Sequence, residues 1–134
     1  MAMSGNKFVL DTSAYSAFNR GDARLSSFIN PDHLIMVPLI VLGELRAGFA
    51  RGNRKEDNVM LLQRFLDSPN VYLLGITDKT SQIYAEIYAG LRKIGRPIGT
   101  NDMWIAAACV ENDLDLLTLD ADFKNIIGLK IVNL

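Results

Sequence analysis

Residues 7–13, Lys-Phe-Val-Leu-Asp-Thr-Ser, join a short apolar run to three polar side chains. Phe8, Val9 and Leu10 have the composition of a buried strand, and the apolar run stops abruptly at Asp11. The side chains of an Asp-Thr-Ser sequence can accept hydrogen bonds from the first N–H groups of a following helix. The stretch therefore predicts a buried strand whose carboxyl end passes into a helix at Asp11.

Strands and helices alternate through the rest of the chain. Apolar runs predict further strands at residues 34–37, 71–74, 114–119 and 130–133. Helical spacing and capping residues predict helices from residue 38 toward 49, over 56–66, from 77 to about 95, and over 103–111. This alternation is typical of an α/β fold, in which helices cover both faces of a mostly parallel sheet. Ligands of such folds bind beyond the carboxyl ends of the strands, so a site is expected at that edge.

The length of 134 residues is that of one domain with a substantial core. We assign residues 7–134 to a single domain and residues 1–6 to a disordered N-terminal tail. No apolar run approaches the ~20 residues that a membrane helix needs, and the first residues lack the order of a signal peptide. The single cysteine, Cys109, excludes an internal disulfide framework and suits a reducing compartment, so we expect a cytoplasmic protein.

The net charge of −1 comes from 15 acidic and 14 basic side chains. If four of the acids were neutralised by a bound cation, 11 acids would remain against 14 Lys and Arg, an excess of three positive charges. The charge balance is therefore compatible with a phosphate-containing substrate, although it does not argue for one.

Four acidic side chains occupy positions where a carboxylate is unexpected. Asp11 and Asp120 directly follow apolar runs, at the carboxyl ends of predicted strands. Glu44 lies on a predicted helix whose residues three and four positions away are all apolar or small. Asp102 opens a helix that is almost entirely apolar. Burying a carboxylate is costly unless it is paired or bound to a metal, so these positions call for an explanation.

Each of these acids also has an ordinary structural explanation. Asp11 can serve only as a helix cap, and Asp102 is favourable near the positive end of a helix dipole. Glu44 can pair with Arg46 or face water at a helix edge. Turn chemistry explains one of Asp120 and Asp122, but less readily both.

The four acids are more informative together, because the predicted topology brings them to one rim of the sheet. Clustered carboxylates repel and do not all stay ionised without a cation. A site whose ligands are all oxygen atoms suits Mg²⁺ or Mn²⁺. Zinc sites are built mainly from histidine and cysteine, and this chain has only one of each. We interpret His33 as a solvated loop residue, and Cys109, Trp104 and Phe123 as core residues.

The order of these motifs resembles that of the PIN-domain family. The matching stretches are residues 8–13 (FVLDTS), 41–48 (VLGELRAG), 101–107 (NDMWIAA) and 117–123 (LTLDADF). They span nearly the whole chain, with spacing similar to that of VapC-type toxins of type II toxin–antitoxin pairs.

The resemblance implies an α/β/α sandwich, Mg²⁺- or Mn²⁺-dependent endoribonuclease activity, a homodimer, and inhibition by a cognate antitoxin protein. Carried over to this sequence, the catalytic and metal-binding acids are Asp11, Glu44, Asp102 and Asp120, with Asp122 as a further candidate ligand. Thr12, Asn101 and Thr118 correspond to supporting polar positions. A metal-activated water is expected to attack the scissile RNA phosphate in line.

Basic residues near these motifs are candidate contacts for RNA phosphates. They form two groups, one after Glu44 and one before Asp102, and comprise Arg46, Arg51, Arg54, Arg92, Lys93 and Arg96. The alternative is that they are solvated residues at helix ends, where Lys and Arg are favourable. Apolar surplus on residues 59–66 and 83–91 is available for a dimer or antitoxin interface, or for the domain's own core.

Other functions remain open at this point. A haloacid-dehalogenase-like phosphatase needs a second aspartate two residues after the first, where this chain has Ser13, and neither it nor a receiver domain has a use for Glu44. A Ser-His-Asp triad has only His33 available and lacks a nucleophile elbow. Within the PIN family, an RNA-processing nuclease outside a toxin–antitoxin system and a non-catalytic RNA- or protein-binding module are the alternatives.

Overall fold

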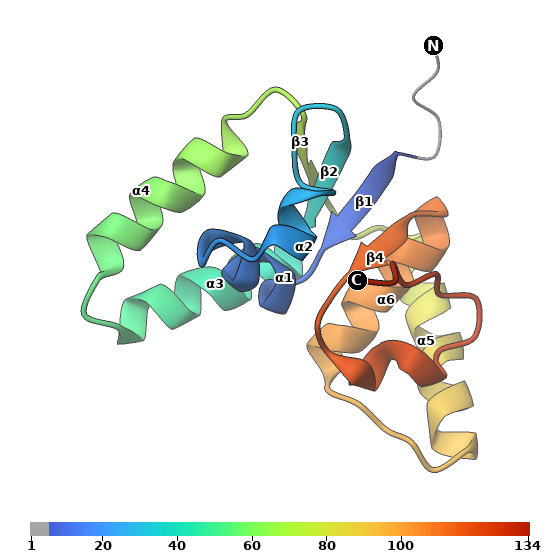
Figure 1. Cartoon of the computed structure of the whole chain (residues 1–134). Coiled ribbons are helices and arrows are strands. Elements are labelled where there is room, and N and C mark those ends of the chain that lie inside the picture. The colour runs from blue at the N-terminus through green and yellow to red at the C-terminus, as the bar shows by residue number, and fades with distance from the viewer. Residues whose placement is uncertain (1–5) are drawn as a thin grey trace.

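The computed structural model describes residues 6–134 (Figure 1). Residues 1–5, which make up most of the expected N-terminal tail, lie outside the described residues. Asn6 is half-buried, and its carbonyl oxygen accepts a hydrogen bond of 3.0 Å from the N–H of Leu34. The chain is therefore attached to the sheet from the residue before the first strand.

The elements follow one another in the alternating order that the sequence predicts. They are β1 (Lys7–Leu10), α1 (Thr12–Asn19), α2 (Ala23–Ser26), β2 (Leu34–Pro38), α3 (Leu39–Arg51), α4 (Lys55–Leu66), β3 (Val71–Leu74), α5 (Asp78–Lys93), α6 (Thr100–Asn112), β4 (Asp115–Leu117) and the 3-10 helix η1 (Ala121–Asn125). The short helix α2 was not predicted. Its cap is Asp22, whose side chain accepts a hydrogen bond from the N–H of Arg24.

The four strands form one sheet in the order β3-β2-β1-β4, and every neighbouring pair is parallel. Helices α5 and α6 lie on one side of this sheet, and α1, α2 and α4 lie on the other (Figure 1). Helix α3 contacts β2, α1, α4 and α6 and so connects the two helical layers. The predicted α/β/α sandwich with a parallel sheet is confirmed.

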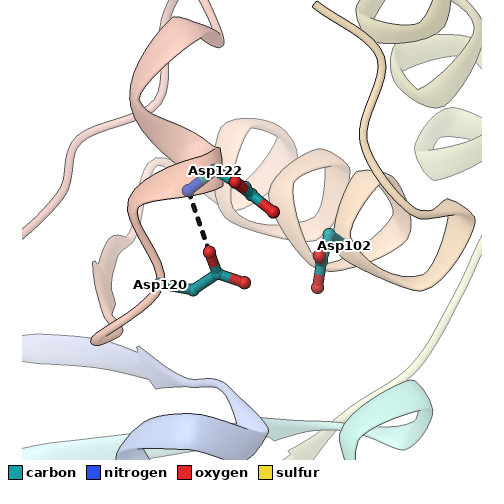
Figure 2. Close-up of side chains that lie close together, drawn as sticks. All are labelled: Asp102, Asp120 and Asp122. Carbon is teal, nitrogen blue, oxygen red and sulfur yellow. Dashed lines mark hydrogen bonds between the residues drawn. The ribbon is translucent and has the colours of Figure 1, made fainter.

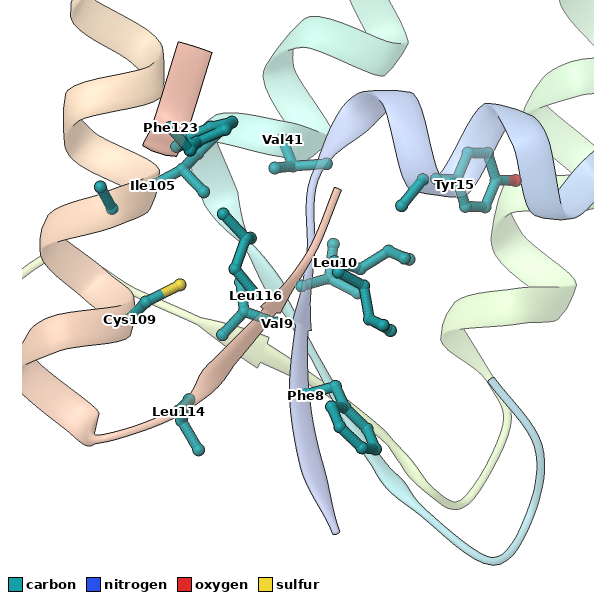
Figure 3. Close-up of a cluster of buried hydrophobic side chains, with 14 of the residues drawn as sticks. Phe8, Val9, Leu10, Tyr15, Val41, Ile105, Cys109, Leu114, Leu116 and Phe123 are labelled. Carbon is teal, nitrogen blue, oxygen red and sulfur yellow. The ribbon is translucent and has the colours of Figure 1, made fainter. Parts of the chain in front are cut away.

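The core lies between the central strands and the two helical layers (Figure 3). Val9 and Leu10 of β1 and Leu116 and Leu117 of β4 are fully buried, which explains why these strands read as continuous apolar runs. Phe123 is also fully buried, so η1 is held against this core. Cys109 is buried among the same residues, as predicted.

Two predicted strands are shorter than the sequence suggested. The strand predicted over residues 114–119 ends at Leu117. Beyond it, the hydroxyls of Ser13 and Thr118 accept the N–H groups of Leu119 and Asp120 at 3.0 and 2.9 Å, so side chains replace the sheet ladder. The strand predicted at 130–133 is a single parallel bridge between Ile131 and Leu116.

Parallel pairing places the carboxyl ends of all four strands at one edge of the sheet. Asp11 follows β1 there, α3 follows β2, and the segment 118–122 follows β4. Helix α6 begins at Thr100, three residues before its predicted start, which puts Asp102 in its first turn. None of the helices within residues 6–134 is long and apolar enough to cross a bilayer.

Candidate metal centre

A cleft of about 370 Å³ opens at the carboxyl edge of the sheet. It is lined by Asp11, Thr12, Ser13, Ser16, Glu44, Asp102, Ile105 and Asp120. These residues come from the ends of β1 and β4 and from α1, α3 and α6. The structure thus brings together the four acids that the sequence analysis singled out, although they are up to 109 positions apart in the chain (120 minus 11).

Asp102, Asp120 and Asp122 form the tightest group of carboxylates at this edge, which we call the aspartate triad (Figure 2). One carboxylate oxygen from each side chain lies within 4.8 Å of the other two. Asp102 is presented by the first turn of α6, and Asp120 caps η1 by accepting the N–H of Asp122 at 2.9 Å. Three hard oxygen donors at this spacing fit a divalent cation such as Mg²⁺ or Mn²⁺.

Asp11 is the most deeply buried acid of the cleft, with 4% of its surface exposed. Its Oδ1 accepts the N–H of Ala14 and the hydroxyl of Ser13, each at 2.8 Å, and Oδ2 accepts the hydroxyl of Thr118. Burial raises the pKa of Asp11, while these hydrogen bonds from Thr118, Ala14 and Ser13 oppose that rise. Asp11 therefore caps α1 and also holds its carboxylate in a fixed orientation toward the cleft.

Glu44 is half-buried on α3 and is held by two polar side chains from other elements. The hydroxyl of Thr12 donates to Oε1 at 2.7 Å, and the amide of Asn101 donates to Oε2 at 3.2 Å. The alternative pairing of Glu44 with Arg46 is not among the ion pairs of residues 6–134. Thr12 and Asn101 thus link α1, α3 and α6 around the Glu44 carboxylate.

The acids of the cleft repel one another, and this repulsion contributes to the raised pKa of Asp102. Partial burial, followed by repulsion from Asp120, Glu44, Asp11 and Asp122, raises the pKa of Asp102 to about 6. A cation between these side chains would remove the repulsion and favour the ionised form. The electrostatics of the cleft thus support the same conclusion as its donor atoms.

Ser13 is a supporting residue that the sequence analysis missed. Its hydroxyl donates to Asp11 and accepts the N–H of Leu119, so it ties the end of β1 to the segment after β4. Thr118, the residue after β4, has the equivalent function, since it donates to Asp11 and accepts the N–H of Asp120. The available signal was the pair of hydroxyl residues directly after a strand-end aspartate, where local hydrogen bonding is common.

The candidate RNA-contacting residues are spread over several surfaces. Arg46 and Arg51 are exposed on α3, and Arg54 forms an exposed ion pair of 3.4 Å with Asp57. The Arg92 guanidinium lies 5.5 Å from the centre of the Tyr88 ring on α5. Lys93 and Arg96 are exposed where α5 ends, and Arg96 lines a hollow together with Asp122 of the aspartate triad.

Two other interpretations of single residues are corrected. His33 is not simply solvated, because Nδ1 donates to the carbonyl of Phe28 at 2.7 Å and the half-buried ring packs edge-on against Phe8. It precedes β2 and so lies at the amino edge of the sheet, away from the cleft, which argues against a Ser-His-Asp triad there. Trp104 is half-buried rather than core, and stacks on Tyr84 with ring centroids 4.2 Å apart.

Comparison with known proteins places this geometry in a family. The model of the PIN domain matches residues 8–129. Ribonuclease VapC1 of Rickettsia felis is 32% identical over 126 residues, which cover 92% of this chain and 93% of the relative. Ribonuclease VapC5 of Mycobacterium tuberculosis is 28% identical over 120 residues, which cover 90% and 87% respectively.

Solved structures agree with these relatives. The crystal structure of VapBC2 from Rickettsia felis bound to a DNA fragment from their promoter contains a chain that superposes with a TM-score of 0.81 and 27% identity. The match covers 95% of this chain and 98% of that one. The chain described here therefore belongs to the PIN-domain family, in the group that includes the VapC ribonucleases.

Proposed function

We propose that this protein is a Mg²⁺- or Mn²⁺-dependent endoribonuclease and the toxin component of a toxin–antitoxin pair. The observation that carries the proposal is the cleft at the carboxyl edge of the sheet, where Asp11, Glu44, Asp102 and Asp120 meet and Asp122 completes the aspartate triad. The ribonuclease names of the relatives support the same activity. The buried side chains of residues 8–126 form one cluster, which supports a single nuclease domain.

The residues of the cleft fit a hard divalent ion. Asp102, Asp120 and Asp122 would hold it, with Asp11 as a further ligand across the cleft. Each Asp11 oxygen already accepts hydrogen bonds, but a carboxylate oxygen has two lone pairs, so Oδ2 can accept Thr118 and still ligate. When bound, such an ion activates water and offsets the charge that develops on a phosphate during hydrolysis.

The other groups of the cleft hold the Glu44 and Asp11 carboxylates in place. Thr12 and Asn101 fix the Glu44 carboxylate, whose Oε2 has a single donor and so keeps a lone pair that can accept a proton from an attacking water. Ser13 and Thr118 prevent rotation of Asp11. Ile105 contributes an apolar surface to the wall of the cleft. These residues therefore provide position and a proton acceptor next to the site that would hold the cation.

We further propose a cognate antitoxin and a second copy of the chain as partners, in the cytoplasm. Large apolar side chains remain exposed on α4 and β3, including Met60 at 57%, Leu73 at 54% and Tyr72 at 50%. Exposed apolar side chains on neighbouring elements are typical of protein interaction surfaces. A structural relative from Mycobacterium tuberculosis, described as a member of the VapBC family of toxin-antitoxin systems, supports an antitoxin as one of the partners.

The activity is tested by incubating the purified protein with a structured RNA in Mg²⁺, in Mn²⁺ and in excess EDTA. We expect discrete cleavage products with either ion, none with EDTA, and recovery of cleavage when metal is restored. The Asp102→Asn variant serves as the matched control and is expected to yield no products above background. Equal cleavage by wild type and Asp102→Asn, or cleavage that persists in EDTA, would reject the proposal.

A further inference from the structure

A second hollow, of about 350 Å³, lies beside the aspartate triad. It is formed by two short segments, the connection between α5 and α6 and the 3-10 helix η1, and is lined by Gly95, Arg96, Pro97, Ile98, Ala121, Asp122, Lys124 and Asn125. Asp122 belongs to both this hollow and the triad, so the two sites are continuous. We call this hollow the Arg96–Lys124 groove.

The groove carries two cations, Arg96 and Lys124, that form no ion pair with an acid among residues 6–134. Arg96 is exposed on one wall and Lys124 on the other. Within residues 6–134 the ion pairs are Arg24–Asp22, Arg54–Asp57 and Lys130–Asp113, so neither groove cation has an acidic partner within 4.0 Å. The cation-rich groove thus directly adjoins an acidic cleft.

The backbone gives the groove a defined shape. Helix α5 ends at Lys93, and Gly95 has a φ of +69°, which allows the N–H of Arg96 to donate to the carbonyl of Leu91 at 2.9 Å. On the opposite wall, Phe123 is fully buried and so anchors η1, which carries Lys124. The two cations therefore lie on segments that are fixed to the core, although their own side chains are solvated.

We propose that the Arg96–Lys124 groove binds the backbone phosphates of a single RNA strand next to the scissile bond. This inference rests on the proposed ribonuclease function and deepens it. An acidic cleft repels RNA, so attraction must come from cations outside the metal ligands. An arginine can bind a phosphate with two parallel hydrogen bonds, and a lysine adds a point charge from the other wall. Arg96 and Lys124 are thus substrate-positioning residues, not metal ligands.

The groove is tested with the double variant Arg96→Gln/Lys124→Gln. The control Arg64→Gln/Lys79→Gln removes one arginine and one lysine charge from exposed positions on α4 and α5, neither of which forms an ion pair within residues 6–134. The measurement is the KM and kcat for a single-stranded RNA in Mg²⁺ over a series of salt concentrations. For the groove variant we expect KM to rise about tenfold, kcat to change less than about threefold, and the control to match wild type.

The salt dependence adds a readout that a purely structural effect does not change. The slope of log(kcat/KM) against log[salt] is negative when phosphate contacts hold the RNA. Loss of two contacts should make it less negative by about 1.4, because each contact to a single strand contributes about 0.7. Mn²⁺ affinity of the groove variant, measured by calorimetry, should remain within about threefold of wild type if the aspartate triad is intact.

The possible failures are distinguishable. An unchanged KM and salt slope in the groove variant, while wild type cleaves RNA, would overturn the groove assignment and leave the nuclease function standing. A loss confined to kcat would also overturn it. If wild type fails to cleave RNA with either metal, the proposed function fails. RNA binding by the groove is then measured separately by fluorescence anisotropy with the same RNA. Asp120→Asn is compared with the same protein carrying Arg96→Gln/Lys124→Gln. Equal RNA affinities of these two proteins would refute binding by the groove.

Discussion

The Asp120→Asn variant is expected to lose about 100-fold or more of the kcat for RNA cleavage while keeping its fold. Asp120 contributes to the aspartate triad and lines the cleft with Asp11 and Asp102. Asparagine removes the charge that holds a cation, and the loss of a group supporting a metal site already costs roughly 10–100-fold. The amide oxygen can still accept the N–H of Asp122, as Asp120 Oδ1 does at 2.9 Å, so η1 should remain capped.

The matched control is Asp32→Asn, which removes the same charge from an exposed loop residue. It should cleave RNA at the wild-type rate. Thermal unfolding of both variants verifies that the fold is retained. Wild-type activity in Asp120→Asn would mean that the reaction does not take place at this cleft.

The affinity of the protein for Mn²⁺ is expected to fall about tenfold between pH 7 and pH 5. The pKa of Asp102 is raised to about 6, chiefly by partial burial and then by the neighbouring acids. A cation binds the ionised carboxylate, so binding requires loss of this proton. With a pKa of about 6, Asp102 is ionised in about ten of eleven molecules at pH 7 and about one of eleven at pH 5. Since raising a carboxyl pKa favours the neutral form, affinity is lost as the pH falls through 6.

The Asp102→Asn variant separates this effect from the titration of other groups. It should bind Mn²⁺ more weakly at pH 7, and its remaining affinity should change less between pH 7 and pH 5 than that of wild type. Calorimetric titration at several pH values measures both proteins. A wild-type affinity that is constant over this range, or an equally steep dependence in Asp102→Asn, would contradict the assignment of Asp102 as the titrating ligand.

The sheet and the location of the site follow from simple patterns. Buried parallel strands read as continuous apolar runs, and the acids at their carboxyl ends meet because parallel strands end at the same edge. Glu44 was detectable because a carboxylate among apolar neighbours on a helix requires a partner. The structure provides two such partners, Thr12 and Asn101.

Other features depend on contacts between distant segments and were not predictable from local patterns. The end of β4 at Leu117 results from hydroxyls that replace sheet hydrogen bonds, and one of these belongs to Ser13 on another element. Asp122 and Asp102 are 20 positions apart in the sequence, and they come together because Phe123 of η1 and Ile105 of α6 are buried in the same core cluster. His33 looked solvated because its partners, Phe8 and Phe28, become neighbours only when the sheet has formed.

Lys124 illustrates the same limit for function. In the sequence it is a single basic residue near the end of the chain, far from the two basic groups beside the motifs. Only the fold brings it to the same groove as Arg96, next to Asp122 of the aspartate triad. The proposed attraction for an RNA backbone therefore depends on two residues, Arg96 and Lys124, that are 28 positions apart in the sequence.

The central claim is that one divalent ion site is built by Asp102, Asp120 and Asp122 at the carboxyl edge of the sheet. Crystals grown with Mn²⁺ and measured at a wavelength near its absorption edge address it directly. We predict an anomalous peak in contact with carboxylate oxygens of all three aspartates. Saturating Mn²⁺ that yields no peak there, or one only at a different group of residues, would contradict the account.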